Sequence, residues 1–136
     1  MIDAIIDEIL LKKSDWQDFT FESIYFGGGT PSILEENEYN RIIEAVKNNF
    51  RFSTHVELTL EANPDDINPT AVKKWKSAGI NRLSIGLQSL NNEELVFMNR
   101  SHTAAESMIA VDTSLQSGIA DISIDLIYGS HLKTDK

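Results

Sequence analysis

Apolar positions along this chain follow two alternating patterns, one with the period of a strand and one with the period of a helix. Runs rich in β-branched and aromatic residues, with turn-forming residues nearby, occur at 21–26, 55–61, 81–88 and 121–129. Such runs are typical of β-strands. We therefore expect four strands, separated by segments of a different periodicity.

The segments around these strands have the spacing of amphipathic helices. We expect a leading helix over residues 2–11, then helices over 39–50 and around 72–75, and two more that begin at Asn91 and Thr103.

Start and stop signals support these helices. Ser32 with Glu35 resembles a capping box at the start of the second helix. Asn68 and Pro69 resemble an N-cap followed by a first-turn proline, and Gly79 resembles a C-terminal stop.

The expected order of elements is therefore α-β-α-β-α-β-α-α-β, in a chain that is most simply one domain over residues 1–136. Strands separated by helices run parallel and are joined by right-handed crossovers. The pattern predicts an α/β fold and, at this point, leaves open whether the sheet is open or closed into a barrel.

Alternation within the strands favours a partly open barrel. One face of each inner strand is apolar, and the other is polar or small. The polar or small positions are Glu57, Thr59 and Glu61, then Ser84, Gly86 and Gln88, then Ser123 and Asp125. Closed barrels fill their interior with bulky branched residues, and helix-covered parallel sheets are usually apolar on both faces. We therefore expect a concave polar face that holds a large polar ligand.

Candidate ligand residues lie where the strands end. The turn Gly27–Thr30, Glu61 and Gln88 follow C-terminal strand ends, where α/β folds bind ligands, and Asp125 lies slightly deeper. Three consecutive glycines are costly to order, so we expect the backbone to approach a ligand closely there. The turn matches neither the Rossmann fingerprint nor the P-loop, but its N–H groups and hydroxyl can bind a charged ligand.

Each candidate also has an ordinary structural explanation. The glycine turn could simply join a strand to a helix, Glu61 could be a solvated strand end, and Arg100 could close a surface helix. The mid-strand position of Asp125 instead favours a function or a specific buried partner. The histidines lack metal-ligand spacing, and we expect structural or exposed positions for His55, His102 and His131.

Charge and composition narrow the classes of function. The formal net charge is −9, so nucleic-acid binding through a basic face is not expected. No apolar run reaches the roughly 18 residues of a membrane span, and the acidic N-terminal segment lacks the early basic charge of a signal peptide. We expect a soluble cytoplasmic protein. The chain has no cysteine, which excludes disulfides, thiolate catalysis and a cysteine-ligated metal or iron–sulfur cluster within it.

Four stretches together resemble one known family. They are YFGGGTPSIL, LEANPDD, RLSIGLQSLNNEELVFMNRSHT and SIDLIYG, within residues 2–129. In this order and spacing they are similar to the oxygen-independent coproporphyrinogen III oxidase family of radical-SAM proteins, including its haem-chaperone relatives. The family fold is an open (β/α)6 TIM-like barrel of parallel strands with helical crossovers.

The resemblance implies S-adenosylmethionine and a 4Fe-4S cluster as cofactors of the family, and a tetrapyrrole as its partner molecule. It also implies a set of cofactor-binding residues but no catalytic or metal-ligating residue in this chain. The implied S-adenosylmethionine contacts are Gly28, Gly29, Thr30, Glu61, Gln88, Arg100 and Asp125. The stretches LSIGLQS and NRSHT look closer to the haem-chaperone branch than to the oxidase branch.

The chain departs from the family at the cluster. The family's C-x-x-x-C-x-x-C motif lies before the leading helix, and here no cysteine occurs anywhere. We therefore expect a fragment with four of six strands, without the N-terminal cluster-binding segment and the C-terminal strands, which is inactive as given. Cut sheet edges predict self-association. The alternatives are a cysteine-free ligand-binding module, or an unrelated barrel that binds a phosphorylated metabolite.

Overall fold

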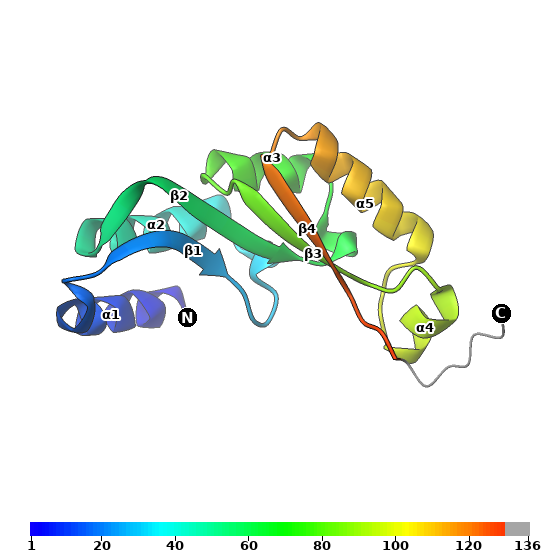
Figure 1. Ribbon diagram of the computed structural model, residues 1–136, viewed down its shortest axis with the longest axis horizontal. Helices are drawn as coiled ribbons and strands as arrows, with labels where there is room; N and C mark the ends of the chain where they lie inside the picture. Colours follow the sequence, from blue (N-terminus) through cyan, green and yellow to red (C-terminus); the bar gives the residue numbers. More distant parts are fainter. Residues whose placement is uncertain (130–136) are drawn as a thin grey trace.

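The computed structural model describes residues 1–129 and has an α/β architecture (Figure 1). Its four strands form one parallel sheet in the order β1-β2-β3-β4. Their bounds are Thr20–Phe26 for β1, Arg51–Ala62 for β2, Arg82–Gln88 for β3 and Asp121–Leu126 for β4. All four expected strands are present. The fourth ends at Leu126 and not at residue 129, because its neighbour β3 ends at Gln88, the partner of Leu126 in the register.

Helices connect the strands as the pattern predicts. Their bounds are Ile2–Lys12 for α1, Glu36–Asn49 for α2, Pro69–Ser77 for α3, Asn92–Phe97 for α4 and Ala104–Gln116 for α5. Short 3-10 helices occur at Lys13–Trp16 (η1), Pro31–Ile33 (η2) and Pro64–Asp66 (η3). Figure 1 shows α2 beside β1 and β2, and α3 and α5 along β3 and β4. Between residues 1 and 129, no helix is long and apolar enough to cross a membrane.

One predicted helix start is wrong. The capping box of α2 is formed by Glu35 and Glu38, whereas Ser32 lies buried in η2. The Ser32 hydroxyl donates instead to the Asp66 carboxylate at 2.6 Å. The proline at position 31 starts a separate 3-10 turn, which takes Ser32 away from the helix end.

The other start signals are confirmed. The Asn68 side chain accepts hydrogen bonds from the N–H groups of Thr70 and Ala71 at the start of α3. Thr103 and Glu106 form a capping box at the start of α5. The two N-terminal caps therefore satisfy backbone N–H groups that the first turn of a helix leaves unpaired.

The apolar core lies between the sheet and the helices. It includes Tyr39 of α2 and Trp75 of α3, both fully buried, which pack with the apolar strand positions. Those strand positions include Leu58, Leu60, Leu83, Ile85 and Leu87. Each fully buried aliphatic side chain of this kind contributes about 2 kcal/mol through the hydrophobic effect. The core therefore fixes which face of each strand is turned away from the helices.

The face turned away from the helices is polar, as the alternation predicts. Arg82 donates to the hydroxyl of Thr59 at 3.3 Å and to that of Ser123 at 3.1 Å, and its guanidinium lies 3.7 Å from the Glu57 carboxylate. Ser123 in turn donates to the hydroxyl of Ser84 at 3.2 Å. The hydrogen bonds cross all the strands from β2 to β4, so this polar face is internally paired.

Candidate functional site

A polar cavity of about 250 Å³ lies at the C-terminal ends of the strands. Six of the seven predicted site residues line it: Gly29, Thr30, Glu61, Gln88, Arg100 and Asp125. The seventh, Gly28, lies at its edge, where its N–H donates to a Glu61 carboxylate oxygen at 3.1 Å. Residues up to 97 positions apart in the sequence therefore meet at one edge of the sheet, because parallel strands end on the same side.

The three consecutive glycines have two different structural reasons. Gly28 and Gly29 have φ values of +80° and +58°, and a Cβ atom at either would meet no atom within 4 Å. Their conformation requires glycine, and the space beside them is open. At Gly27 a Cβ atom would lie 2.7 Å from the Tyr25 ring and 3.1 Å from the Glu61 carboxyl carbon. Gly28 and Gly29 are therefore required by their backbone conformation, whereas Gly27 leaves room for Tyr25 and Glu61.

Glu61 fastens the glycine turn to the sheet. One carboxylate oxygen accepts from the Gly28 N–H, and the other accepts from the Tyr25 hydroxyl at 2.8 Å. The interpretation of Glu61 as a free solvated strand end is therefore wrong. Both of its oxygens are engaged, and they join β1, the turn and β2.

Tyr25 is a site residue that the sequence analysis missed. Its pKa is raised, chiefly by the hydrogen bond to Glu61 and then by burial, and the Asp125 carboxylate acts in the same direction. Ser84 opposes the rise by a hydrogen bond to the phenol. The signal that could have found Tyr25 is its place on the polar face, with Ser23 and opposite Ile24 and Phe26, directly before the glycines.

Asp125 is itself exposed, but the expectation of a specific buried partner is confirmed. The partner is Ser84, which is only 6% exposed and whose hydroxyl donates to the Asp125 carboxylate at 3.1 Å. The position is solvated because β4 is the last strand of the described sheet and no further strand covers its side. This exposure leaves the Asp125 carboxylate accessible from the cavity.

Gln88, the last residue of β3, and Arg100, in the loop after α4, both line the cavity. Gln88 has a φ of +67°, which is unusual for a residue other than glycine and costs of order 1 kcal/mol. Its side-chain amide folds back to within 2.7 Å of where a Cβ atom of Gly86 would lie. In residues 1–129, the Arg100 guanidinium makes no hydrogen bond or ion pair, although Arg100 lines the cavity and does not end a helix. A cation and an amide are therefore available to a ligand.

The site does not fit an iron–sulfur cluster or another metal. Over the described part of the chain, no group of three or more histidine, cysteine, aspartate or glutamate residues is arranged to hold a metal ion. No cysteine occurs in the full sequence. His55 is exposed, His102 is buried against a backbone carbonyl, and His131 lies outside the described residues.

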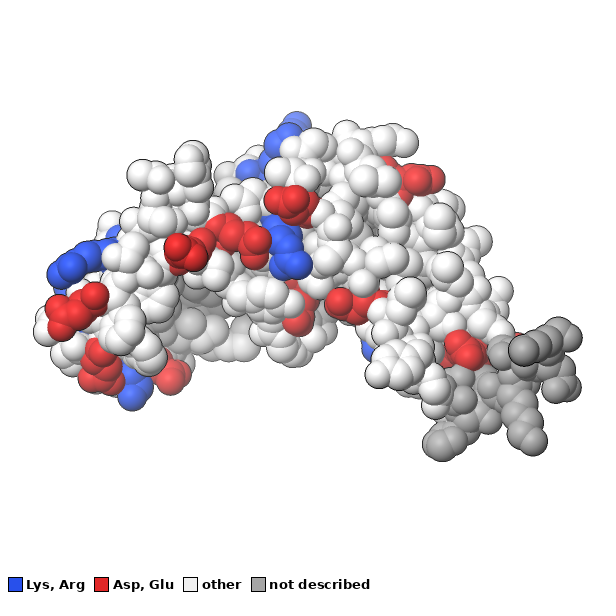
Figure 2. All heavy atoms as spheres, in the orientation of Figure 1, with Lys and Arg blue, Asp and Glu red and all other residues white. Residues whose placement is uncertain are grey.

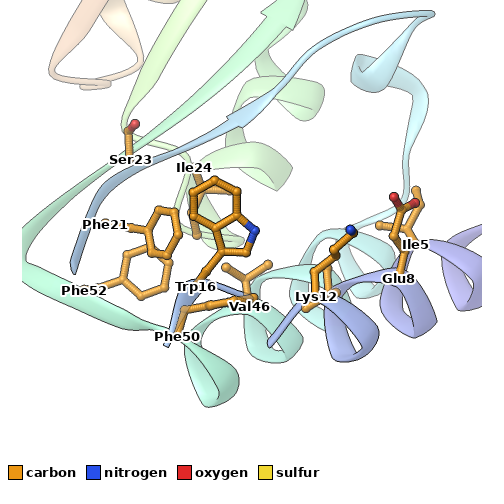
Figure 3. Close-up of a pocket in the computed structure, with 11 residues that line it drawn as sticks. Ile5, Glu8, Lys12, Trp16, Phe21, Ser23, Ile24, Val46, Phe50 and Phe52 are labelled. Atoms are coloured by element: carbon orange, nitrogen blue, oxygen red, sulfur yellow. The ribbon is translucent and has the colours of Figure 1, made fainter. Parts of the chain in front are cut away.

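A second cavity, of about 440 Å³, has a different character (Figure 3). We call it the apolar groove, and it is lined by Ile5, Glu8, Ile9, Lys12, Trp16, Phe21, Ser23, Ile24, Val46, Phe50 and Phe52. The Trp16 indole lies in the middle of these side chains, near Phe21 and Val46. The wall of the apolar groove is mostly aromatic and aliphatic, so the groove lacks the converging polar groups of the polar cavity.

The surface charge agrees with the acidic composition. Figure 2 shows acidic side chains gathered across the middle of one face, with few basic side chains among them and no continuous basic patch on that face. With a formal net charge of −9, this face gives no electrostatic footprint for nucleic acid.

Comparison with known proteins identifies the family. A family model described as the radical SAM superfamily matches residues 3–136. The chain is 37% identical over 117 residues to the heme chaperone HemW of Haemophilus influenzae, and 30% identical over 128 residues to the oxygen-independent coproporphyrinogen III oxidase of Salmonella typhimurium. The alignments cover 86% and 94% of this chain, but only 30% and 28% of those relatives.

A solved structure gives the same result at the level of the fold. The coproporphyrinogen III oxidase HemN from Escherichia coli, described as a radical SAM enzyme, matches with a TM-score of 0.80 and 28% identity, over 93% of this chain and 29% of that one. The parallel strands and helical crossovers are therefore confirmed as part of a TIM-like barrel. From the family match over nearly its whole length and from this shared fold, the chain belongs to the radical SAM superfamily.

Proposed function

We propose that the polar cavity binds S-adenosylmethionine, through Gly28, Gly29, Thr30, Glu61, Gln88, Arg100 and Asp125. The observation that supports this most is the convergence of these side chains and the glycine turn on one cavity. S-adenosylmethionine carries a carboxylate, an ammonium group and ribose hydroxyls, so it needs both a cation and acceptors. This cavity offers each.

The assignment of roles follows the chemistry of each group. The Arg100 guanidinium is suited to the methionyl carboxylate, because guanidinium–carboxylate pairs are charge-assisted and directional. The N–H groups of Gly29 and Thr30, next to the Gly28 N–H that Glu61 holds, bind the same methionyl end. The Asp125 carboxylate accepts from the ammonium group or from a ribose hydroxyl, and the Gln88 amide accepts from or donates to a ribose hydroxyl. Glu61 acts mainly by holding the turn.

The cluster of the superfamily does not fit this chain, which has no thiolate to ligate it. When present, a 4Fe-4S cluster supplies the electron that cleaves S-adenosylmethionine. The chain spans about 30% of its relatives' length, so we assign no step through the cluster to its own residues. A longer protein that carries the cysteines would perform the reductive cleavage.

In such a protein, we infer a role in haem or porphyrin metabolism. Similar proteins include both a heme chaperone and a coproporphyrinogen III oxidase. The stretches LSIGLQS and NRSHT favour the chaperone reading, and the oxidase reading is the second candidate. The cytoplasmic location stays a prediction.

Self-association is a further proposal. In residues 1–129, one edge of β1 and one edge of β4 have no neighbouring strand. Unpaired edges offer backbone donors and acceptors to another copy. Light scattering after size-exclusion chromatography is expected to give a dimer or larger species, and a monomer at all working concentrations would contradict this proposal.

The binding test uses nuclear magnetic resonance of the ¹⁵N-labelled chain, titrated with S-adenosylmethionine. We expect saturable shifts at the Gly28 and Gly29 amides, and loss of affinity in Arg100→Ala. Arg51→Ala, at an exposed site at the start of β2, is the matched control. No shift in the folded chain, or equal shifts with inorganic phosphate alone, would overturn the proposal and favour the ligand-module or phosphate alternatives.

The reaction test uses a longer protein with the cluster cysteines, reconstituted anaerobically. Formation of 5′-deoxyadenosine after dithionite and S-adenosylmethionine are added is the expected result. Coproporphyrinogen consumption would then identify the oxidase, and stable haem binding without it would identify the chaperone. A reconstituted protein that forms no 5′-deoxyadenosine would contradict the radical reading.

A further inference from the structure

Three loops border the polar cavity, and a buried histidine joins them. His102 lies in the loop that follows Arg100, and it is only 3% exposed. Its Nε2 atom lies 3.2 Å from the carbonyl oxygen of Leu87, at the end of β3. Its Nδ1 atom lies 3.6 Å from the carboxylate of Asp65, in the loop after β2. The ring therefore connects the ends of β2 and β3 to the loop before α5.

The partners of His102 determine how the ring is held. A carbonyl oxygen can only accept, so Nε2 carries the proton toward Leu87. Asp65 also accepts from the Ser101 hydroxyl at 2.7 Å. Burial raises the pKa of Asp65, but the hydrogen bonds from Ser101 and from the Asp65 backbone, followed by the His102 ring, outweigh it, so the pKa is lowered. The carboxylate is thus ionised beside the ring. It holds Ser101 by a hydrogen bond, and it attracts the His102 ring when Nδ1 carries a proton as well as Nε2.

The ring acts on two cavity residues through the backbone. The Leu87 carbonyl belongs to the peptide unit that leads into Gln88, whose φ of +67° needs support from its surroundings. Arg100 lies two residues before the ring, so the same contact anchors the backbone segment from which its side chain extends. Gln88 is the last residue of β3 and Arg100 lies in the loop between α4 and α5, so both reach the polar cavity from positions where regular structure ends.

We infer that His102, oriented by Asp65, is a positioning residue that places the Gln88 amide and the Arg100 guanidinium for the ligand of the cavity. This inference rests on the proposed binding of S-adenosylmethionine. It goes further by assigning a role to two residues that lie outside the cavity. The competing explanation is that His102 only fills space in the core. It predicts that an apolar variant of similar size leaves Gln88 and Arg100 in place.

The test compares two substitutions at the same position. His102→Leu fills much of the space but cannot donate, whereas His102→Gln retains an amide N–H that can reach the Leu87 carbonyl. His55→Leu, at an exposed histidine of β2, is the matched control. Unfolding in urea first establishes that each variant is folded.

The primary readout needs no ligand. In ¹⁵N spectra, we expect the Gln88 side-chain amide and the Arg100 Nε–H signals to move in His102→Leu, and to return toward their original positions in His102→Gln. Affinity for S-adenosylmethionine should fall about tenfold in the first variant and recover in the second. A folded His102→Leu chain with unmoved Gln88 and Arg100 signals would overturn the inference.

Two outcomes are separated by this design. If the parent chain does not bind S-adenosylmethionine, the proposed function fails, but the ligand-free spectra still decide the role of His102. If His102→Leu does not fold, Asp65→Asn provides the same comparison, because it keeps the size and removes the charge. Displaced Gln88 and Arg100 signals in that variant support the inference, and undisplaced signals reject it.

Discussion

Strand β1 connects two regions that are built in opposite ways. It begins at the apolar groove, where Phe21 packs on Phe50 and Phe52 with ring centroids 5.5 and 5.8 Å apart. It ends at the polar cavity, where Tyr25 donates to Glu61 at 2.8 Å. The groove is held by contacts that depend little on direction, and the cavity by hydrogen bonds that depend strongly on it.

The two regions also differ in their backbone conformation. The cavity contains the left-handed residues Gly28, Gly29 and Gln88, whereas the positions that line the groove lie in helices and strands or at their ends. Strained or special backbone is common at functional sites and is supported by the rest of the fold. We therefore expect substitutions in the groove to reduce stability, and substitutions in the cavity to affect binding and local order more than stability.

The largest stability effect is expected in the groove. Phe21→Ala removes a ring that contacts Trp16, Phe50 and Phe52, and should lower the free energy of unfolding by about 2 to 3 kcal/mol. Urea denaturation measures this loss. Phe19→Ala, at a ring that is 55% exposed, is the control and should cost less than about 1 kcal/mol. Equal losses from both variants would contradict a packed groove.

The next effect is expected at Glu61. Glu61→Gln keeps the size of the side chain but replaces one acceptor oxygen with an NH₂ donor. Tyr25 and Gly28 can then no longer each donate to an oxygen of their own. We expect about 1 kcal/mol less stability and a pKa of Tyr25 that returns toward 10.0. The phenol titration, followed by ultraviolet absorbance, measures the shift.

Glu44→Gln on the exposed side of α2 is the control for the loss of one charge. An unchanged Tyr25 titration in Glu61→Gln would mean that the hydrogen bond is not what raises the phenol pKa.

The sequence predicted the elements well because strands, helices and caps depend on local patterns. Two helix starts are confirmed, that of α5 at Thr103 with Glu106 and that of α3 at Asn68 with Pro69. In each pair the two residues lie within four positions of one another. The Ser32 interpretation was wrong because its partner, Asp66, is 34 residues away.

The site was predicted in part for the same reason. Alternation along each strand identified the polar face, and the family resemblance supplied the candidate residues that line the cavity. The roles of Tyr25 and His102 depend on contacts between strands, namely Tyr25 to Glu61 and His102 to Leu87. No single segment carries that information.

An effect of similar size should separate two neighbouring glycines. Gly27→Ala places a methyl group against the Tyr25 ring, and should cost about 1 kcal/mol of stability, most of which disappears in a Tyr25→Ala background. Gly28→Ala should cost about 1 kcal/mol in both backgrounds, because its cost comes from a φ of +80°. A double-mutant cycle in urea measures both couplings. If Gly27→Ala and Gly28→Ala were coupled equally to Tyr25→Ala, the contact of Gly27 with the Tyr25 ring and the positive φ of Gly28 would not be separate reasons for glycine.

The smallest effect is a dependence of stability on acid. The backbone N–H and hydroxyl of Thr103 donate to Glu106 and lower its pKa below the ordinary value of 4.5, and the pKa of Asp65 also lies below its ordinary 3.8. A lowered folded pKa means that the unfolded chain binds the proton more readily. The stability from these two carboxylates is therefore fully present above about pH 5 and is lost as the pH falls through their folded values.

Urea unfolding at several pH values tests this dependence. Glu106→Gln and Asp65→Asn should each flatten the fall in stability between pH 5 and pH 3, because the substituted groups no longer titrate. Phe21→Ala should lower stability by a similar amount at every pH in that range, since a phenyl ring binds no proton. A steeper acid dependence in Phe21→Ala than in the parent would show that the groove is coupled to the titrating carboxylates Glu106 and Asp65, and would reject the independence of the groove from the rest of the fold.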